Sequence, residues 1–248
     1  MRRYLFRVAS QFLLGCVLVL GGISQSHAAA VAYISNCGSS MSFLNGYGNT
    51  VTDVSESGLT LSSLSGYNAV IAQSNCQFVN PTNIGNVLAD FADDGGRVIL
   101  TEFVFQGMWA LGGRIMTDGY SPFTIDPNSD GYFISSNLGN ILDSGNSLLT
   151  GLNTANIVTD YQALVGLDST ATLVAQWDSS RGAIAYNAAR NVVGLNLFDP
   201  NVSVDTQRLL ANAISTNLSS TSVPEPGSLA LLGLGLAGLG FSRRKSAC

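Results

Sequence analysis

Basic side chains are scarce in this 248-residue chain and unevenly placed along it. The one histidine is His27 and the one lysine is Lys245, so neither type occurs between them. Without histidine, Ser-His-Asp catalysis, Cys-His catalysis and histidine-ligated zinc are excluded from that interval. Residues 29–222 hold five arginines and fifteen carboxylates, a formal charge of −10. Phosphate binding needs clustered cations, so nucleic acid is excluded as a partner.

The N-terminus has the order of an export signal. Three arginines lie within residues 1–7, an apolar run covers 12–23, and Ser26-His27-Ala28 follows. A basic start, a short apolar run and a small-x-Ala ending predict a secretory signal peptide over 1–28, with Ala30 as the alternative cleavage point. The other interpretation is a retained transmembrane helix, for which the apolar run is short.

The C-terminus carries a second apolar segment in a different context. A polar linker over 219–222 leads to Pro224-Glu225-Pro226, an apolar Leu/Gly/Ala run over 229–241, and the basic cluster Arg243-Arg244-Lys245. The apolar run partitions into a bilayer, and the basic cluster stays on its cytoplasmic side. The prolines keep the preceding segment extended, where a protease can bind it.

This order closely resembles the PEP-CTERM sorting signal of Gram-negative bacteria that produce exopolysaccharide. The resemblance implies that 223–248 is a removable signal, recognised by an exosortase and cleaved near Pro224-Glu225-Pro226. It also implies transient anchoring in the inner membrane, followed by release to the cell surface or biofilm matrix. A plain C-terminal anchor is the alternative, but the run is short and glycine-rich for a permanent span.

The interval 29–218 reads as one α/β domain, long enough for a sizeable core. Short apolar runs predict strands over 31–35, 50–54, 67–72 and 97–101. Residues 40–44 could open a helix. A helix is predicted over 81–91, because apolar residues recur there at i, i+3, i+4 and i+7 after Pro81. Buried strands that alternate with helices indicate a parallel sheet with helices on both faces.

The second half of the domain follows a different pattern. Strands are predicted over 171–177, 182–186 and 191–198, with tight turns that make them antiparallel, and a helix over 206–218. The interval 103–170 is rich in Gly, Asn and Ser, and we expect a short helix at 138–142 and long loops there. The fold class is therefore α/β, a doubly wound, mainly parallel, flavodoxin-like sheet with antiparallel strands toward the C-terminus.

The strand order and the segments 95–100 and 190–195 resemble the class I glutamine-amidotransferase-like fold, including relatives of the trehalose-utilisation type. In working amidotransferases a nucleophilic cysteine stands on a glycine-flanked elbow after the fourth strand. Here that place reads Thr101-Glu102-Phe103-Val104, without cysteine or flanking glycine. The catalytic histidine is absent as well, so the resemblance does not extend to the activity.

Two cysteines remain between the terminal signals, and both follow strands. Cys37 and Cys76 each end the triplet Ser-Asn-Cys after the first and third strands, which are neighbours in a sheet of order 2-1-3-4. Adjacent strands lie within disulfide reach, and export favours oxidation. We predict a Cys37–Cys76 disulfide, with a pair of reactive thiols as the alternative.

One segment resembles half of a calcium loop. Asp126, Asn128 and Asp130 stand at alternate positions before Gly131, as in the D-x-N-x-D-G pattern. The twelfth position is Asn137 instead of glutamate, so we favour an Asx-rich turn and predict neither metal nor cofactor.

Polar residues gather where strands of the predicted sheet end, and ligands bind at that edge in such folds. Glu102 could serve there as a general acid or base, with Asn36, Asn75 and Arg114 lining a polar cleft. The alternative for Glu102 is a solvated loop carboxylate. Four aromatic residues could form a sugar-binding surface or a satellite core; they are Trp109, Tyr120, Phe123 and Tyr132.

Two classes of function fit these patterns. The first is a non-enzymatic surface or matrix protein that binds exopolysaccharide or another envelope component. The second is a carbohydrate-active hydrolase that uses carboxylates such as Glu102. The absence of histidine and of an elbow cysteine favours the first.

Overall fold

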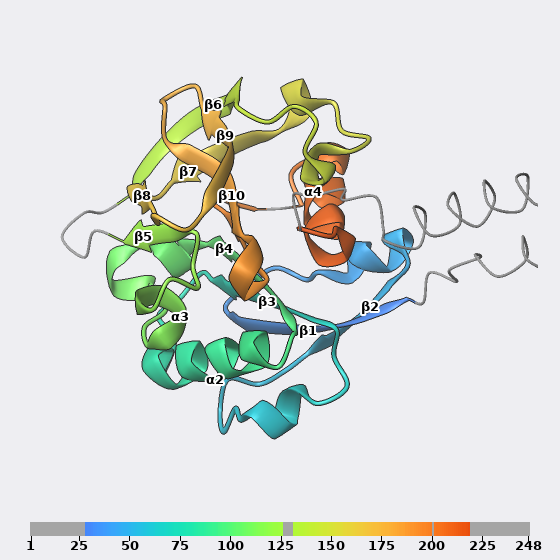
Figure 1. Ribbon diagram of the computed structural model, residues 1–248, viewed down its shortest axis with the longest axis vertical. Coiled ribbons are helices and arrows are strands. Elements are labelled where there is room, and N and C mark those ends of the chain that lie inside the picture. The colour runs from blue at the N-terminus through green and yellow to red at the C-terminus, as the bar shows by residue number, and fades with distance from the viewer. Residues whose placement is uncertain (1–27, 126–130, 200, 219–248) are drawn as a thin grey trace, which may run out of the picture.

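The structure is a computed structural model, and it describes residues 28–125, 131–199 and 201–218. A nine-stranded sheet runs through this part of the chain in the order β2-β1-β3-β4-β11-β10-β9-β6-β7, and β5 and β8 form a small second sheet (Figure 1). The strands are β1 (Ala29–Asn36), β2 (Asn49–Asp53), β3 (Ala69–Ser74), β4 (Arg97–Glu102), β5 (Phe123–Ile125), β6 (Tyr132–Ile141), β7 (Val158–Gln162), β8 (Val165–Leu167), β9 (Thr172–Trp177), β10 (Gly182–Asn187) and β11 (Val192–Leu195).

The first half of the sheet is parallel and the second half is antiparallel. Strands β2, β1, β3, β4 and β11 run in one direction, and β10, β9, β6 and β7 follow as antiparallel neighbours. The predicted order 2-1-3-4 and the antiparallel C-terminal strands are therefore confirmed. All carboxyl ends of the parallel strands meet at one edge of the sheet, here named the carboxyl edge, and their first residues meet at the amino edge.

Two helices cover opposite faces of the parallel strands, α2 (Pro81–Asp93) and α4 (Val204–Ser215) (Figure 1). Asn80 caps α2 by accepting from the Asn83 backbone N–H at 3.1 Å, and proline stands in its first turn. Ser203 caps α4 in the same way through the Thr206 N–H at 3.0 Å.

Strand alternation divides the core between these helices. Val70 and Val98 point to the α2 face, whereas Ile71 and Ile99 point to the α4 face. Because both faces are covered, the central parallel strands β3, β4 and β11 are mainly apolar and do not alternate in polarity, whereas the edge strand β2 is mostly polar.

The helix predicted over 138–142 is wrong, because these residues belong to the long strand β6. Leu138 pairs with Trp177 of the neighbouring strand β9. Ser136 and Leu138 are buried, whereas the alternate residues Asn137 and Gly139 are exposed. This alternation has a period of two, which is that of a strand. The helix that was expected to begin within 40–44 is a 3₁₀ helix, η2 (Ser42–Tyr47).

Short helices fill the connections of the domain. They are α3 (Arg114–Thr117), η3 (Leu61–Leu64), η4 (Phe103–Phe105), η5 (Gly107–Trp109), η6 (Ser147–Leu149), η7 (Thr154–Asn156) and η8 (Ala188–Arg190). None of the helices within the described ranges combines the length and apolar character needed to cross a bilayer.

Arg97 fixes the end of α4 against the amino edge of the sheet. Its guanidinium donates to the carbonyl oxygens of Ala213 at 2.8 Å and Thr216 at 2.7 Å, and to Asn191 Oδ1 at 2.5 Å. Burial lowers the pKa of Arg97 to about 10. A cation at the C-terminus of a helix binds its free carbonyls, so Arg97 holds the end of α4 at the amino edge.

Candidate functional site at the carboxyl edge

Glu102 ends β4 in a backbone conformation that side-chain-bearing residues seldom adopt. Its φ is 56° and its ψ is −135°, while its N–H donates to the Leu197 carbonyl at 3.1 Å. Such a conformation costs about 1–3 kcal/mol and persists where the surrounding structure enforces it, often at functional sites. The side chain is 2% exposed. The alternative of a solvated loop carboxylate is therefore wrong.

A row of polar side chains connects Glu102 to the neighbouring strands. Ser35 pairs with Gln73 across β1 and β3, and Gln73 pairs with Thr101 across β3 and β4, so these side chains share the α4 face. The hydroxyl of Tyr33 on the same face donates to Gln73 Oε1. Gln73 is completely buried and lies beside the Glu102 carboxyl.

Burial raises the pKa of Glu102 to about 7. The neighbouring Gln73 side chain and Asp199 backbone N–H oppose this shift, and the negative charge of Asp199 adds to it. Burial also raises the pKa of Tyr33. The carboxyl edge thus holds a carboxyl group that changes protonation near neutral pH, which is the property of a general acid or base.

Several polar atoms of this edge have no hydrogen-bond partner within the described residues, although they are shielded from solvent. They are Ser35 Oγ, Gln73 Nε2, Ser74 Oγ, Thr101 Oγ1, Glu102 Oε2 and Gln106 Oε1. An unpaired buried polar group costs about 1–3 kcal/mol, so a concentration of them at one edge is expensive for the folded domain. It indicates a place where hydrogen-bonding atoms from outside the chain complete the pairing.

A pocket of about 580 Å³ opens at this edge, between the ends of β1 and β2. Tyr33 and Ser35 form part of its wall, and Asp53 and Ser55 line the side of β2. Gly38 closes over both hydroxyls, because a Cβ there would lie 1.8 Å from Ser35 Oγ and 2.2 Å from Tyr33 Oη. A second pocket of about 630 Å³, lined by Tyr67 and residues near Gly96, lies at the amino edge and contains none of these unpaired atoms.

The sequence did not identify Tyr33, Gln73 or Asp199 as candidate site residues. A signal for two of them was available, because a tyrosine and a glutamine interrupt otherwise apolar buried strands. A fully buried polar residue is more informative than an exposed one, since it must be paired. Nothing local marks Asp199, which the return of β11 brings beside Glu102.

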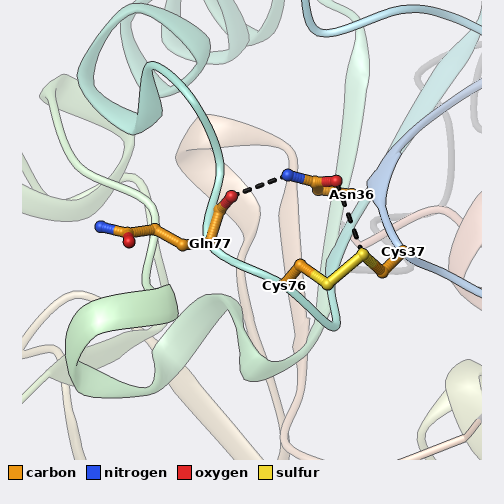
Figure 2. Close-up of a disulfide and its surroundings, with 4 residues drawn as sticks. All are labelled: Asn36, Cys37, Cys76 and Gln77. Carbon is orange, nitrogen blue, oxygen red and sulfur yellow. Dashed lines mark hydrogen bonds between the residues drawn. A yellow bond between two sulfur atoms is a disulfide. The ribbon is translucent and has the colours of Figure 1, made fainter.

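The Cys37–Cys76 disulfide is confirmed, with Cα atoms 5.5 Å apart (Figure 2). It joins the loops after β1 and β3, and Asn36 Nδ2 reinforces the connection by donating to the Gln77 carbonyl at 2.7 Å. The Asn75 N–H donates to the Asn36 carbonyl at 3.0 Å. Both asparagines thus lie at the carboxyl edge, where they hold the two loops together.

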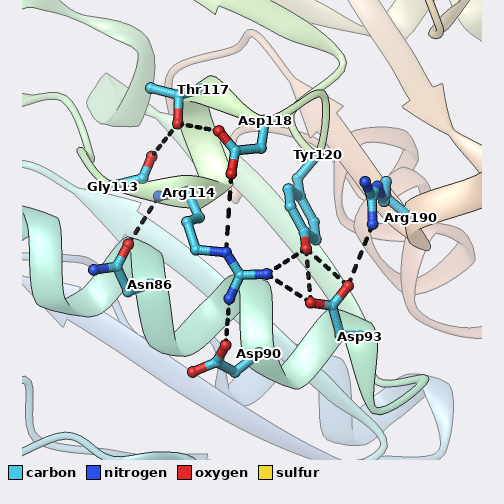
Figure 3. A network of polar contacts seen from close by, with 9 residues as sticks. All are labelled: Asn86, Asp90, Asp93, Gly113, Arg114, Thr117, Asp118, Tyr120 and Arg190. Carbon is cyan, nitrogen blue, oxygen red and sulfur yellow. Dashed lines mark hydrogen bonds and ion pairs between the residues drawn. The ribbon is translucent and has the colours of Figure 1, made fainter.

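Arg114 does not lie with the other cleft candidates but in a separate network of polar contacts, which Figure 3 shows. It donates to Asp90 and to Asp93 near the end of α2, and to the Tyr120 hydroxyl at 2.6 Å. Arg190, the last residue of η8 just before β11, approaches the same Asp93 at 3.4 Å. The network therefore lies toward the amino edge, and these partners raise the pKa of Arg114 and lower that of Asp93.

The aromatic candidates for a sugar-binding surface differ in burial. Tyr120 and Phe123 are buried in the core. Trp109 is partly buried and packs edge-on against Phe103, the residue after Glu102, with ring centroids 4.8 Å apart. The exposed ring of Phe133 extends this cluster through Tyr161.

Part of the calcium-loop segment lies outside the described residues, namely Asp126, Asn128 and Asp130. In the described ranges, no three His, Cys, Asp or Glu side chains gather in an arrangement that could hold a metal ion.

A family match was found for the C-terminal tail, and structural similarity was found for the α/β domain. Residues 222–245 match the PEP-CTERM protein-sorting motif, and this is the signature of an exported protein that an exosortase processes after transient anchoring. The motif contains Pro224-Glu225-Pro226 and Arg243-Arg244. No curated protein matches the chain.

Solved structures resemble the domain at low identity. A protein from Bacteroides uniformis described as ThuA-like has 12% identity and a TM-score of 0.51, covering 81% of this chain and 96% of its own. A Thermoplasma acidophilum protein described as part of a GMP synthase has 13% identity and a TM-score of 0.50, covering 76% and 94%. A cytoplasmic protein of Salmonella typhimurium has 10% identity and a TM-score of 0.57, covering 74% and 97%. The chain therefore joins a PEP-CTERM sorting motif to an α/β domain of the ThuA-like, class I glutamine-amidotransferase-like fold.

Proposed function

We propose that this protein is delivered by an exosortase to the cell surface or biofilm matrix of a Gram-negative bacterium, where its α/β domain binds a saccharide of the envelope or exopolysaccharide. The observation that carries the binding role is the group of shielded, unpaired polar atoms beside the carboxyl-edge pocket. Sugars offer dense hydroxyl donors and acceptors, which would complete this pairing.

The positions of the first strand and of the end of the last helix support the same role. Ala29 begins β1, and Thr216 follows α4 within reach of Arg97, the first residue of β4. Both points therefore lie at the amino edge, on the side opposite the candidate site. A domain tethered through its C-terminal segment would keep the carboxyl edge free for a ligand.

A glycan array probed with the full-length chain tests the binding role. The chain would be kept in a detergent without a sugar headgroup, and bound glycans would be recovered and weighed by mass spectrometry. We expect retention of at least one saccharide with its mass unchanged. Gly38→Ala should abolish retention by filling the pocket wall, whereas the matched control Gly46→Ala should not, since nothing lies within 4 Å of its added Cβ. Absence of any bound saccharide would overturn the proposal.

A carbohydrate-active hydrolase is the second candidate, and one specific observation favours it. Glu102 occupies a strained elbow, and burial raises its pKa to about 7, while Asp199 supplies a second carboxylate nearby. Hydrolysis of glycosides commonly uses two carboxyl groups with pKa values driven apart. Recovery of shortened glycans from the wild type and intact glycans from Glu102→Gln would replace the binding role with this one.

A further inference from the structure

A hydroxyl, a carboxamide and a carboxyl group meet inside the domain where β3 and β4 end. Gln73 of β3 pairs in register with Thr101 of β4, so the two side chains leave the same face of the sheet. Adjacent strands lie about 4.8 Å apart, which puts the Thr101 hydroxyl within reach of the Gln73 carboxamide. Glu102 follows Thr101 directly, and its carboxyl group lies beside the Gln73 side chain.

These groups are enclosed, and their reactive atoms are not held by other residues. Gln73 and Thr101 are completely buried, and Glu102 is nearly so. Among the residues that the structure describes, no hydrogen-bond partner is found for Thr101 Oγ1, Gln73 Nε2 or Glu102 Oε2. The hydroxyl is therefore available as a nucleophile, and the amide nitrogen is available to leave. Enclosure also keeps water from competing for the same carbonyl carbon.

The carbonyl group of Gln73 is polarised by a neighbouring strand. The Tyr33 hydroxyl on β1 donates to Gln73 Oε1. A donor at this oxygen stabilises the negative charge that develops there when a nucleophile adds to the carbonyl carbon. The stabilisation is stronger in the buried interior than in water, because the effective dielectric constant is lower. Tyr33 thus supplies the donor that acyl transfer requires.

Glu102 can move the protons of such a reaction. Its pKa is about 7, so the carboxylate and the acid are both populated near neutral pH. The carboxylate accepts the hydroxyl proton of Thr101, and the acid then delivers a proton to the departing nitrogen of Gln73. One side chain therefore serves first as the base and then as the acid.

From this arrangement we propose that Thr101 and Gln73 react with each other and form an intramolecular ester between β4 and β3. A bond forms between Thr101 Oγ1 and Gln73 Cδ, and the bond between Cδ and Nε2 breaks. The nitrogen leaves as ammonia, which carries away the former hydroxyl hydrogen. A hydroxyl and a carboxamide thus give an ester and ammonia, so atoms and electrons balance without an oxidant or a further reactant.

The ester complements the disulfide of the same edge. Cys37–Cys76 joins the loops after β1 and β3, and the ester joins β3 to β4. Three neighbouring strands of an exported domain are then connected by covalent bonds. The inference goes beyond the proposed saccharide binding and does not depend on it.

Trypsin digestion of the reduced and alkylated full-length chain, followed by mass spectrometry, tests this inference. Trypsin cuts after Arg97 and Arg114, so Gln73 and Thr101 fall in different peptides. We expect one species that contains both peptides and is lighter than their sum by about 17 Da, the mass of the ammonia released. Dilute hydroxylamine, which cleaves esters, should separate this species into two.

Substitutions assign the roles. Thr101→Val should abolish the linked species, whereas Thr101→Ser, which keeps a hydroxyl, should retain it. Glu102→Gln should slow its formation at least about a hundredfold, which is the usual contribution of a general base. The matched control Thr172→Val, at an exposed position of β9, should form the linked species as the wild type does. Circular dichroism melting of each variant shows whether the fold is retained.

Three results would overturn the ester. The first is a folded wild type that yields separate peptides of unchanged mass. The second is a loss of about 17 Da confined to the peptide with Gln73, since a hydroxyl of that peptide, such as Ser35, would then be the nucleophile. The third is a gain of about 1 Da at Gln73, which means that water has hydrolysed the carboxamide. The glycan array tests saccharide binding separately, so the two proposals can fail independently.

Discussion

The hydroxyl of Tyr33 donates to Oε1 of Gln73 across the neighbouring strands β1 and β3, and both side chains are buried. The pair lies between the pocket and the Glu102 carboxyl. A change in the charge of Glu102 therefore reaches the pocket through one intervening side chain, that of Gln73.

The protonation of Glu102 should make stability depend on pH in a specific way. Its pKa is about 7 in the folded domain against 4.5 for an ordinary glutamate, so the folded state binds the proton more tightly. The contribution to stability is complete below pH 4.5 and is lost as the pH rises through about 7. The loss amounts to about 3 kcal/mol, from 1.36 kcal/mol for each pKa unit.

Denaturant unfolding of wild type and Glu102→Gln at several pH values measures this effect. The variant should gain about 3 kcal/mol relative to the wild type between pH 4 and pH 8. Asp93, Asp168 and Asp205, whose lowered pKa values act in the opposite direction, are common to both proteins and cancel in the difference. A difference that stays flat with pH would contradict a buried titrating carboxyl.

The backbone of Glu102 should respond differently to glycine and alanine. Both substitutions remove the carboxyl, but only glycine adopts a φ of 56° with a ψ of −135° without strain. We expect Glu102→Gly to be more stable than Glu102→Ala by about 1 kcal/mol, the reverse of their usual order. Thermal denaturation at pH 8 measures the difference, and an alanine variant as stable as the glycine variant would exclude strain at this elbow.

Loss of the disulfide should destabilise the domain without changing its fold. Cys37 and Cys76 are separated by 39 positions, and closing such a loop stabilises by about 4 kcal/mol in the chain-entropy model. The double substitution to serine should lower the free energy of unfolding by roughly this amount in non-reducing buffer. Wild type with added reductant should approach the double variant, and unchanged stability under both conditions would refute the prediction.

Arg97 should matter more for stability than an exposed arginine of the same edge. Arg97→Met removes hydrogen bonds to Ala213, Thr216 and Asn191 and leaves partly buried oxygen atoms unpaired, which costs about 2–4 kcal/mol. Arg190→Met, which removes a contact of 3.4 Å to Asp93, should cost less than about 1 kcal/mol. Chemical denaturation compares the two variants, and equal losses would contradict a specific role for Arg97.

The sequence by itself determined the features that depend on local pattern. The sorting motif is a contiguous string, and α2 follows from Pro81 and the 3.6-residue recurrence of apolar side chains. The strand order 2-1-3-4 was taken from the resemblance to doubly wound, flavodoxin-like sheets, and with the export signal it was sufficient to pair Cys37 with Cys76. The local pattern of residues 138–142 was not sufficient to distinguish a helix from a strand, because a short apolar run has no clear period until the partner strand β9 is known.

Only the tertiary structure decided which polar residues form the candidate site. Register places Tyr33, Gln73 and Thr101 on one face, and the return of β11 brings Asp199 to Glu102, although Asp199 is 97 positions later in the chain. The structure also moves Arg114 to the amino edge, because its guanidinium pairs with the last turn of α2. Burial and charge at a site are sums over neighbours distant in sequence, so the raised pKa of Glu102 arises only when the sheet is assembled.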